Sequence, residues 1–317
     1  LLYPCWLLFS SKSEKFDWEF HDCYDEWYNR SKYDESRAPT IGSLKYWAKK
    51  CDIGKVTEIH EQNIKFYLYK TLSSCTEYDI AELVHALYQD DYKCTNISKK
   101  CWYEFKNGRW RDIDSGTSLR QALSHRIAKL YHKEVQEALM NAEDINVEDD
   151  KKEKNMEAAR LAEMALKLKT TKWKQNIMRE CCELFYDGKF INKLDTNMDL
   201  MCFNNGVIDF GKKKFRQGEP SDHLSLCTNT DYVELDPDNE DHIRIKNEIT
   251  EFMQQLFPDK NVNKYMWEHL ASILKGGNKN QTFNIYTGSG RNGKSKLVTL
   301  MGMVLGDYKG SVPLTLI

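Results

Sequence analysis

The most informative residues of this sequence are Gly288-Ser289-Gly290-Arg291-Asn292-Gly293-Lys294-Ser295. They match the pattern G-x-x-x-x-G-K-[ST] at every fixed position, which average residue usage would produce by chance in about 1% of chains this long. The five residues before them, Phe283 to Thr287, have strand character, and a helical pattern follows from Lys296 to Met301. Strand, loop and helix in this order are the context that a phosphate-binding loop requires, so the sequence predicts one here.

Each residue type in this loop has a physical role. Gly288 and Gly293 permit backbone conformations that a side chain would forbid, so amide N–H groups can point at phosphate oxygens near the positive end of the following helix. Lys294 is the predicted catalytic residue because it brings a positive charge to the β- and γ-phosphates. Ser295 is the predicted ligand of Mg²⁺. The predicted ligands are therefore ATP and Mg²⁺, and the predicted nucleotide-binding residues are Gly288, Ser289, Gly290, Arg291, Asn292, Gly293, Lys294 and Ser295.

Hydrolysis of ATP needs more than this loop. It also needs an acidic pair on a neighbouring strand, a polar residue that positions water and usually an arginine from another subunit. Residues 296 to 317 contain no acidic pair at the end of an apolar strand, and Asp307 stands in a Gly-Asp-Tyr turn. We therefore expect an incomplete motor domain in a chain cut at both ends. By itself this chain is expected to bind ATP weakly or not at all, and not to hydrolyse it.

Upstream of the loop, two regions predict β-hairpins. Asn107-Gly108 stands between alternating aromatic and polar residues, which is the strongest short-range signal for a hairpin. A two-residue turn there would pair Phe105 with Trp110 and Glu104 with Arg111. The second region runs from Phe203 to Arg216, with Asn205-Gly206 predicted at the first turn, and it suggests two hairpins in succession.

Helical patterns fill most of the remaining sequence. Thr76 and Asp79 are a plausible capping pair for one of these helices, while Pro258 and Gly276-Gly277 are expected to end two others. The charged run 143–154 is predicted to be a solvated connection or a helix end. The apolar positions of the predicted helices are Phe16, Phe20, Tyr24 and Trp27; Ile64, Tyr67, Leu68, Thr71 and Leu72; Ile80, Leu83, Val84, Leu87 and Tyr88; Leu119, Leu123, Ile127 and Leu130; Leu161, Met164, Ala165 and Leu168; Ile249, Phe252, Met253, Leu256 and Phe257; and Met266, Leu270, Ile273 and Leu274.

The composition is that of a soluble globular protein, with 41% hydrophobic and 30% charged residues in 317, enough for two domains. A net charge of −2 means that any contact with DNA must come from local basic patches. Ten cysteines without a CxxC pair support neither a zinc site nor a disulfide framework, and favour a reducing compartment. The apolar opening 1–9 is shorter than the roughly 18 residues that span a membrane, so we expect an intracellular protein without a membrane segment.

The asparagine before the second glycine makes the loop distinctive. The form Gly288-x-Gly290-x-Asn292-Gly293-Lys294-Ser295 resembles the nucleotide loop of superfamily 3 helicases, specifically the primase-helicases of poxviruses, giant nucleocytoplasmic DNA viruses and satellite phages. The resemblance covers nearly the whole chain. Further matching segments are Thr40–Lys49, Asp79–Leu83 with the hairpin from Trp102 to Trp110, and Asn205–Asp209.

This resemblance implies a ring of AAA+ motors, expected to be a homo-hexamer, that unwinds DNA at the replication fork and is fused upstream to a primase. Single-stranded or forked DNA and replication proteins are the expected partners, in the host cytoplasm or nucleus. The predicted fold is an α+β region of helices and β-hairpins followed by the start of an α/β P-loop (AAA+) domain. The predicted domains are a remnant of a primase-linked segment (1–55), a helix-and-hairpin domain (56–245) and the first part of the helicase ATPase domain (246–317).

Two alternatives to this function stay open. A different P-loop NTPase, such as a packaging motor or a kinase, would share Lys294 and Ser295. A non-catalytic module would instead dock the motor on DNA or on partner proteins. Lys106, Arg109, Trp110 and Arg111 are weaker candidates for binding single-stranded DNA through phosphate contacts and base stacking. The alternative for these four residues is a hairpin with one aromatic face in the core and one charged face in water.

Overall fold

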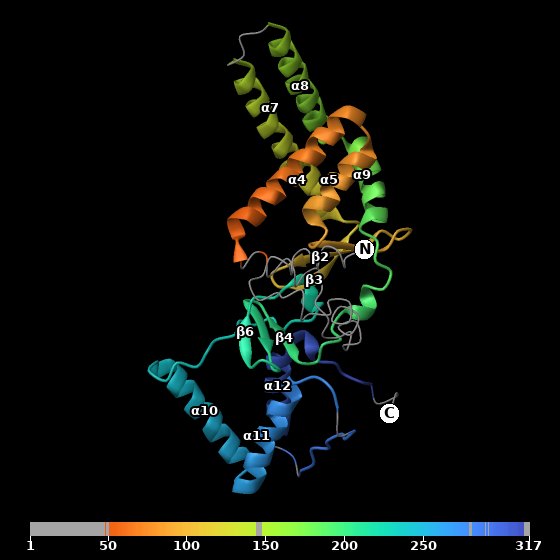
Figure 1. Cartoon of the computed structure of the whole chain (residues 1–317). Coiled ribbons are helices and arrows are strands. Elements are labelled where there is room, and N and C mark those ends of the chain that lie inside the picture. Colours follow the sequence, from red (N-terminus) through yellow and green to blue (C-terminus); the bar gives the residue numbers. More distant parts are fainter. Residues whose placement is uncertain are drawn as a thin grey trace, which may run out of the picture. The chain divides into compact units, whose positions relative to one another are not determined.

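The computed structural model describes residues 48, 51–143, 148–278, 281–288, 290 and 292–313 (Figure 1). They belong to two compact units, residues 1–62 and 63–317. The first unit contributes the beginning of helix α4 (Ile53–Ser74), and the sheets, the cores and the candidate site belong to the second. The predicted helix around residues 16–27 and nearly all of the segment 40–49 lie outside the described residues.

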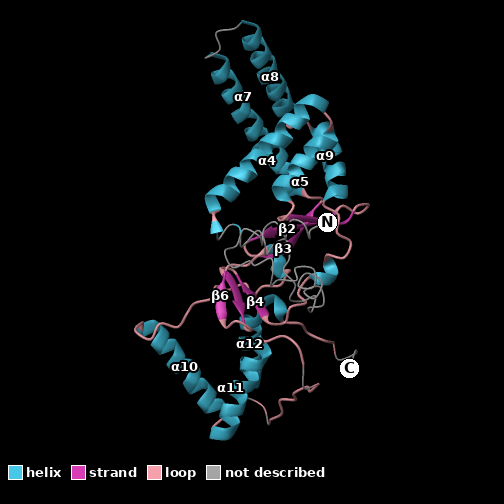
Figure 2. Cartoon of the chain, in the orientation of Figure 1, coloured by secondary structure: helices cyan, strands magenta, loops and turns pink. Residues whose placement is uncertain are grey.

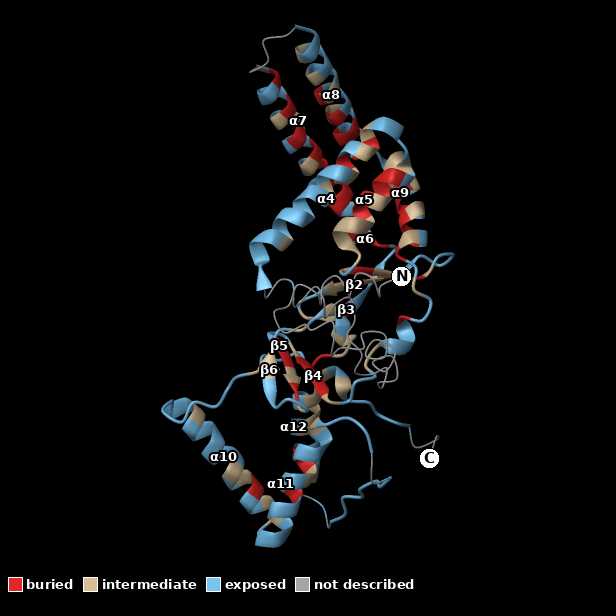
Figure 3. Cartoon of the chain, in the orientation of Figure 1, coloured by how far each residue is buried: buried red, intermediate tan, exposed pale blue. Residues whose placement is uncertain are grey.

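The largest core of the second unit is formed by helices. α4 and α5 (Glu77–Tyr88) bury or partly bury the apolar positions predicted from their sequences, and α7 and α8 pack along each other (Figures 1 and 3). The Thr76 hydroxyl accepts the amide N–H of Asp79 at 3.2 Å, which confirms the predicted cap of α5. The remaining helical elements of this core are α6 (Thr117–Ala122), the π-helical turn η2 (Leu123–Ile127), α7 (Ala128–Glu143), α8 (Glu148–Lys167) and α9 (Thr171–Leu184).

An antiparallel sheet of β1 (Tyr92–Asn96), β2 (Cys101–Lys106) and β3 (Arg109–Asp114) follows α5 in the chain (Figure 2). The β2–β3 hairpin has the predicted register, with Phe105 opposite Trp110 and Glu104 opposite Arg111. Its two turn residues are left-handed, with φ of 53° at Asn107 and 76° at Gly108. This conformation belongs to the tight turn whose twist matches that of the strands, which is why Asn-Gly predicts it.

A second antiparallel sheet contains β4 (Leu200–Phe203), β5 (Gly206–Asp209) and β6 (Lys214–Arg216), so two hairpins do follow one another. The predicted position of the first turn was wrong by one residue. Asn204 and Asn205 form that turn, and Gly206 pairs with Phe203 as the first residue of β5. A Cβ atom at Gly206 would lie 2.6 Å from the Arg216 carbonyl oxygen, so this glycine is needed for the close approach of β6.

Three helices and a short turn form the C-terminal part of the described chain: α10 (Glu240–Leu256), α11 (Lys260–Leu274), α12 (Lys294–Leu305) and the 3-10 turn η5 (Gly306–Tyr308). α10 ends two residues before Pro258, and α11 ends two residues before Gly276, as the sequence predicts. Their core is a small cluster of Met253, Met266, Leu270 and Leu297. Two further 3-10 turns, η3 (Ile191–Lys193) and η4 (Pro220–Asp222), flank the second sheet.

The strand predicted over residues 283–287 is not found. Residues 281–288 are neither helix nor strand, and the side chains of Phe283 and Ile285 are 84% and 72% exposed. A parallel strand is stable only when paired within a sheet that helices cover, and both sheets among the described residues are antiparallel and lie between residues 92 and 216. The helices and hairpins of the predicted α+β region are therefore confirmed, whereas the α/β sheet is not seen in the described part of the chain.

Candidate functional site

The N-terminus of α12 lies within the predicted phosphate-binding loop. The helix begins at Lys294, directly after Gly293, whose φ of 78° is left-handed, and Gly290 is left-handed as well. Among the described residues no side chain caps α12, whereas the side chains of Asn239 and Asp259 cap α10 and α11. Amide N–H groups at the start of a helix that lack such a cap, at its positive end, suit an anion.

Lys294 and Asn292 fold together over Gly288. The Lys294 ammonium donates a hydrogen bond to Asn292 Oδ1. A Cβ atom at Gly288 would stand 2.5 Å from Lys294 Nζ and would overlap the Asn292 amide, so a larger residue there would displace the ends of these two side chains. Three features of this loop suit a polyphosphate ligand. They are the glycine at position 288, the start of α12 without a side-chain cap among the described residues, and the ammonium group of Lys294 on its flexible stem. Ser295 is exposed on the first turn of α12, and Ser289 and Arg291 lie outside the described residues.

The other side of this helix end rests on α10 and α11. Leu297 is buried against Met253, Met266 and Leu270. A Cβ atom at Gly293 would stand 2.9 Å from a methyl group of Leu256 at the end of α10. The small core of these helices therefore fixes the position at which the loop enters α12.

The C-terminal end of α12 is held by a polar network that we call the Asp307 junction (Arg109, Cys227, Asn229 and Asp307). Asp307 accepts hydrogen bonds from the Arg109 guanidinium at 2.9 Å, from the Asn229 amide at 2.6 Å and from the Cys227 N–H at 3.2 Å. The hydrogen bond from Asn229, together with the neighbouring guanidinium, lowers the pKa of the Asp307 carboxyl group. The sequence marks Asp307 only as part of a turn and does not predict this network.

Tyr308 and Gly306 attach η5 to the second sheet. The Tyr308 hydroxyl accepts the N–H of Cys202 at 2.9 Å and donates to the carbonyl oxygen of Leu226 at 3.1 Å. Gly306 has a left-handed φ of 55°, and a Cβ atom there would overlap the backbone of Thr228. The turn after α12 is therefore packed directly against the strand and loop backbone of the upstream region.

The four candidate DNA-binding residues of the first hairpin do not form one surface. Trp110 is 2% exposed and donates from its ring nitrogen to the Pro220 carbonyl oxygen at 2.9 Å. The side chain of Arg109 is 13% exposed and is held in the Asp307 junction. Lys106 and Arg111 are exposed. Trp110 cannot stack on a base in this arrangement, which agrees with the alternative of an aromatic face in the core.

No helix among the described residues is long and apolar enough to cross a lipid bilayer. Within the same residues, no group of three or more histidine, cysteine, aspartate or glutamate side chains is arranged to hold a metal ion.

Comparison with known proteins identifies the chain. Residues 81–260 match the family model described as "D5 N terminal like". This segment contains the first hairpin, most of the helical core and the second sheet. The chain therefore belongs to the D5 N terminal like family.

Its relatives are proteins of large DNA viruses. A candidate helicase of Acanthamoeba polyphaga mimivirus is 36% identical over 306 residues, which cover 96% of this chain and 31% of the mimivirus protein. A candidate helicase of Invertebrate iridescent virus 3 is 25% identical over 96% of this chain and 35% of its own length. A candidate primase of African swine fever virus is 22% identical over 93% of this chain and 33% of its own length. The chain thus spans about a third of the length of the curated relatives it matches, and these relatives are named as candidate helicases and primases.

Proposed function

We propose that this chain carries the nucleotide-binding loop of an ATP-dependent DNA helicase, which acts within a longer viral primase-helicase at the replication fork. The observation that supports this most directly is the uncapped N-terminus of α12, with Lys294 as its first residue and Gly290 and Gly293 in left-handed conformations. The names of the relatives as helicases and primases agree with this proposal. They do not favour a packaging motor or a kinase.

The described residues suggest how the loop would hold ATP. Amide N–H groups at the start of α12 would receive phosphate oxygens, and Lys294 would exchange its hydrogen bond with Asn292 for one with a phosphate. Ser295 would offer its hydroxyl group to Mg²⁺, which neutralises the charge that develops on the phosphates. We further propose that the complete motor is a hexameric AAA+ ring whose other catalytic residues lie beyond the loop, with DNA and replication proteins as its partners.

The nucleotide-binding proposal can be tested with the Lys294→Ala variant. Titration of the chain with a fluorescent ATP analogue and Mg²⁺ should show weak binding that falls by about tenfold to a hundredfold in the variant, because a charge-assisted hydrogen bond contributes about 1.5–3 kcal/mol. Lys296→Ala is the matched control, since Lys296 is an exposed lysine on the same helical turn. Equal affinity of both variants and the unchanged chain would contradict the proposal.

The expected lack of turnover is tested in the same preparation. Phosphate release from ATP should stay at the level of the Lys294→Ala variant, because no acidic pair follows the loop in this sequence. Sustained hydrolysis that depends on Lys294 would show instead that the chain holds a complete catalytic site.

A further inference from the structure

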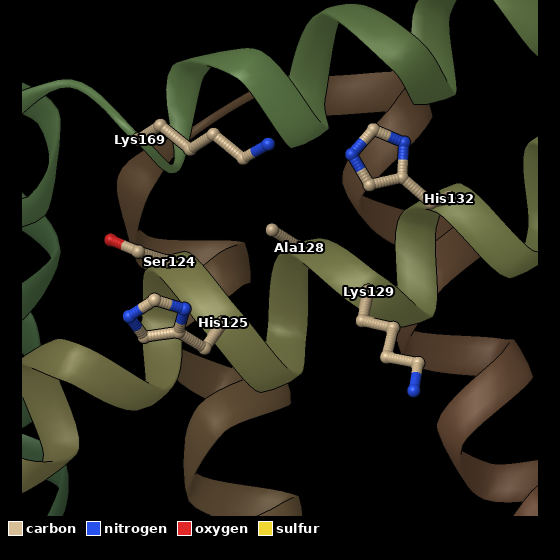
Figure 4. Close-up of a pocket in the computed structure, with 6 residues that line it drawn as sticks. All are labelled: Ser124, His125, Ala128, Lys129, His132 and Lys169. Carbon is tan, nitrogen blue, oxygen red and sulfur yellow. The ribbon is translucent and has the colours of Figure 1, made fainter.

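A hollow of about 370 Å³ lies on the helical part of the chain, away from the nucleotide loop in sequence (Figure 4). Its lining contains two lysines and two histidines, but no carboxylate and no aromatic side chain of Phe, Tyr or Trp. The residues that line it are Ser124, His125, Ala128, Lys129, His132 and Lys169. A surface with two lysines and no carboxylate attracts anions.

The local fold explains how these side chains come together. His125, Lys129 and His132 follow one another at i, i+4 and i+7 along η2 and α7, which places them on one helical face. Ala128 is 1% exposed and forms the floor, because a methyl group leaves space that a larger side chain would fill. Lys169 arrives from the turn after α8.

A hydrogen bond connects the two sides of the hollow. The Ser124 hydroxyl donates to the carbonyl oxygen of Leu168 at 3.2 Å, which ties η2 to the end of α8. In Figure 4 the side chains of Lys169 and His132 point toward each other above Ala128, while Lys129 points away from it. The ammonium of Lys169 is thus directed over the floor of the hollow by the fold.

The charges of the two lysines are not neutralised by nearby acids. Neither Lys129 nor Lys169 forms an ion pair within the described ranges, whereas Lys65, Lys70 and Lys167 on neighbouring helices each pair with a glutamate. Two exposed ammonium groups therefore keep their full attraction for an anion from solution.

The shape of the hollow indicates which anion it suits. It is open to solvent, unlike the enclosed apolar pockets that bury small-molecule ligands. Its only aromatic rings are the imidazoles of His125 and His132, so the charges of Lys129 and Lys169 would be recognised chiefly by phosphate groups. A second hollow of about 430 Å³ shares His125 and adds Lys106 and Arg126, together with the acids Asp91 and Glu104.

We infer that the hollow around Lys169 binds the phosphate backbone of single-stranded DNA, independently of base sequence. This inference rests on the proposed function of the chain as part of a DNA helicase. It places a DNA contact on the upstream helices, separate from the nucleotide loop.

The test compares two double variants of the chain that remove the same charge. Lys129→Ala/Lys169→Ala alters the hollow. Lys189→Ala/Lys260→Ala is the control, since both of these lysines are exposed, lie on other elements and form no ion pair among the described residues. Binding of a fluorescent oligothymidylate is measured by anisotropy at several salt concentrations, and thermal unfolding checks that both variants are folded.

The hollow variant should bind about threefold to tenfold more weakly than the control. Its plot of log affinity against log salt should be shallower by about 0.7 for each phosphate group that the two lysines neutralise in the unchanged chain. A mere decrease in stability would not change this slope. The conservative variant Lys169→Arg should keep the affinity, because it retains the charge.

The inference would be overturned if the unchanged chain did not bind the oligonucleotide at low salt, or if both double variants showed equal affinity and slope. Displacement of the DNA by inorganic phosphate at matched ionic strength would also overturn it, because that result would indicate a site for small anions. Nucleotide binding is measured in parallel. The hollow variant should keep its affinity for the ATP analogue and Lys294→Ala should keep its affinity for DNA, so a failure of either proposal is seen separately.

Discussion

Among single residues, Asp307 connects the most distant parts of the candidate region. It joins Arg109, which is 198 positions away, to Asn229 and Cys227. Asp307→Ala would leave Arg109, with a side chain only 13% exposed, without its carboxylate. We expect a decrease of about 1 kcal/mol in the free energy of unfolding, measured with urea, because Asp307 itself is 39% exposed and solvent weakens the pair.

The same residue predicts a dependence of stability on pH. The pKa of Asp307 is lowered in the folded protein, so its contribution to stability is fully present above the pKa of about 3.9 that it has in the unfolded chain. That contribution is lost as pH falls through the lower folded-state value. The difference in unfolding free energy between the unchanged chain and Asp307→Asn should therefore shrink below about pH 4. A difference that grows toward acidic pH would contradict this assignment.

Among the structural elements, the β2–β3 turn offers a test of backbone conformation. Gly108 has a φ of 76°, and a Cβ atom there would meet no atom closer than 3.6 Å. Gly108→Ala should therefore destabilise the chain by about 1–2 kcal/mol through backbone conformation alone. Gly310→Ala is the control, because Gly310 has no close neighbour and no left-handed φ. Equal unfolding midpoints for the two variants would show that the turn does not need its glycine.

The elements also show what could and could not be predicted from the sequence. Most of the helices and the register of the first hairpin were predicted, because periodicity and Asn-Gly are local signals, whereas no helix was predicted over α9 (Thr171–Leu184). The strand at 283–287 was predicted wrongly, since a parallel strand depends on partners far along the chain or outside it. For the same reason, no local pattern indicates that Arg109 pairs with Asp307 or that Pro220 receives the Trp110 ring N–H. The residues of the nucleotide loop were recognisable from their pattern, and their binding of ATP stays a prediction.

Across the whole second unit, the hydrophobic cores differ greatly in size. Of the residues that the structure describes, twenty-four buried ones form the core around α4 to α9, whereas four hold α10 to α12. Local opening is easiest where few apolar contacts must break. Hydrogen–deuterium exchange followed by mass spectrometry should therefore find faster exchange in α10, α11 and α12 than in α5 and α9. Equal protection would contradict this difference.

Leucine-to-alanine variants give a second measurement of the same contrast. Leu123 is fully buried in the large core, so Leu123→Ala should cost about 2–5 kcal/mol in global unfolding. Leu297→Ala should mainly increase exchange in α12, because Leu297 belongs to the small cluster. An equal decrease of global stability in both variants would show that the two cores unfold as one.

The attachment of η5 determines how α12 can move. The helix has 12 residues and is about 18 Å long, with Lys294 at one end and the firmly bonded turn Gly306–Tyr308 at the other. The hydrogen bonds of η5 hold one end of the helix, whereas the other end rests on a cluster of four buried residues, so a push at the Lys294 end tilts the helix instead of sliding it. A displacement of Lys294 would therefore rotate α12 about η5. Because Asp307 in η5 is bonded to Arg109, the resulting strain would be transmitted to the tip of the β2–β3 hairpin.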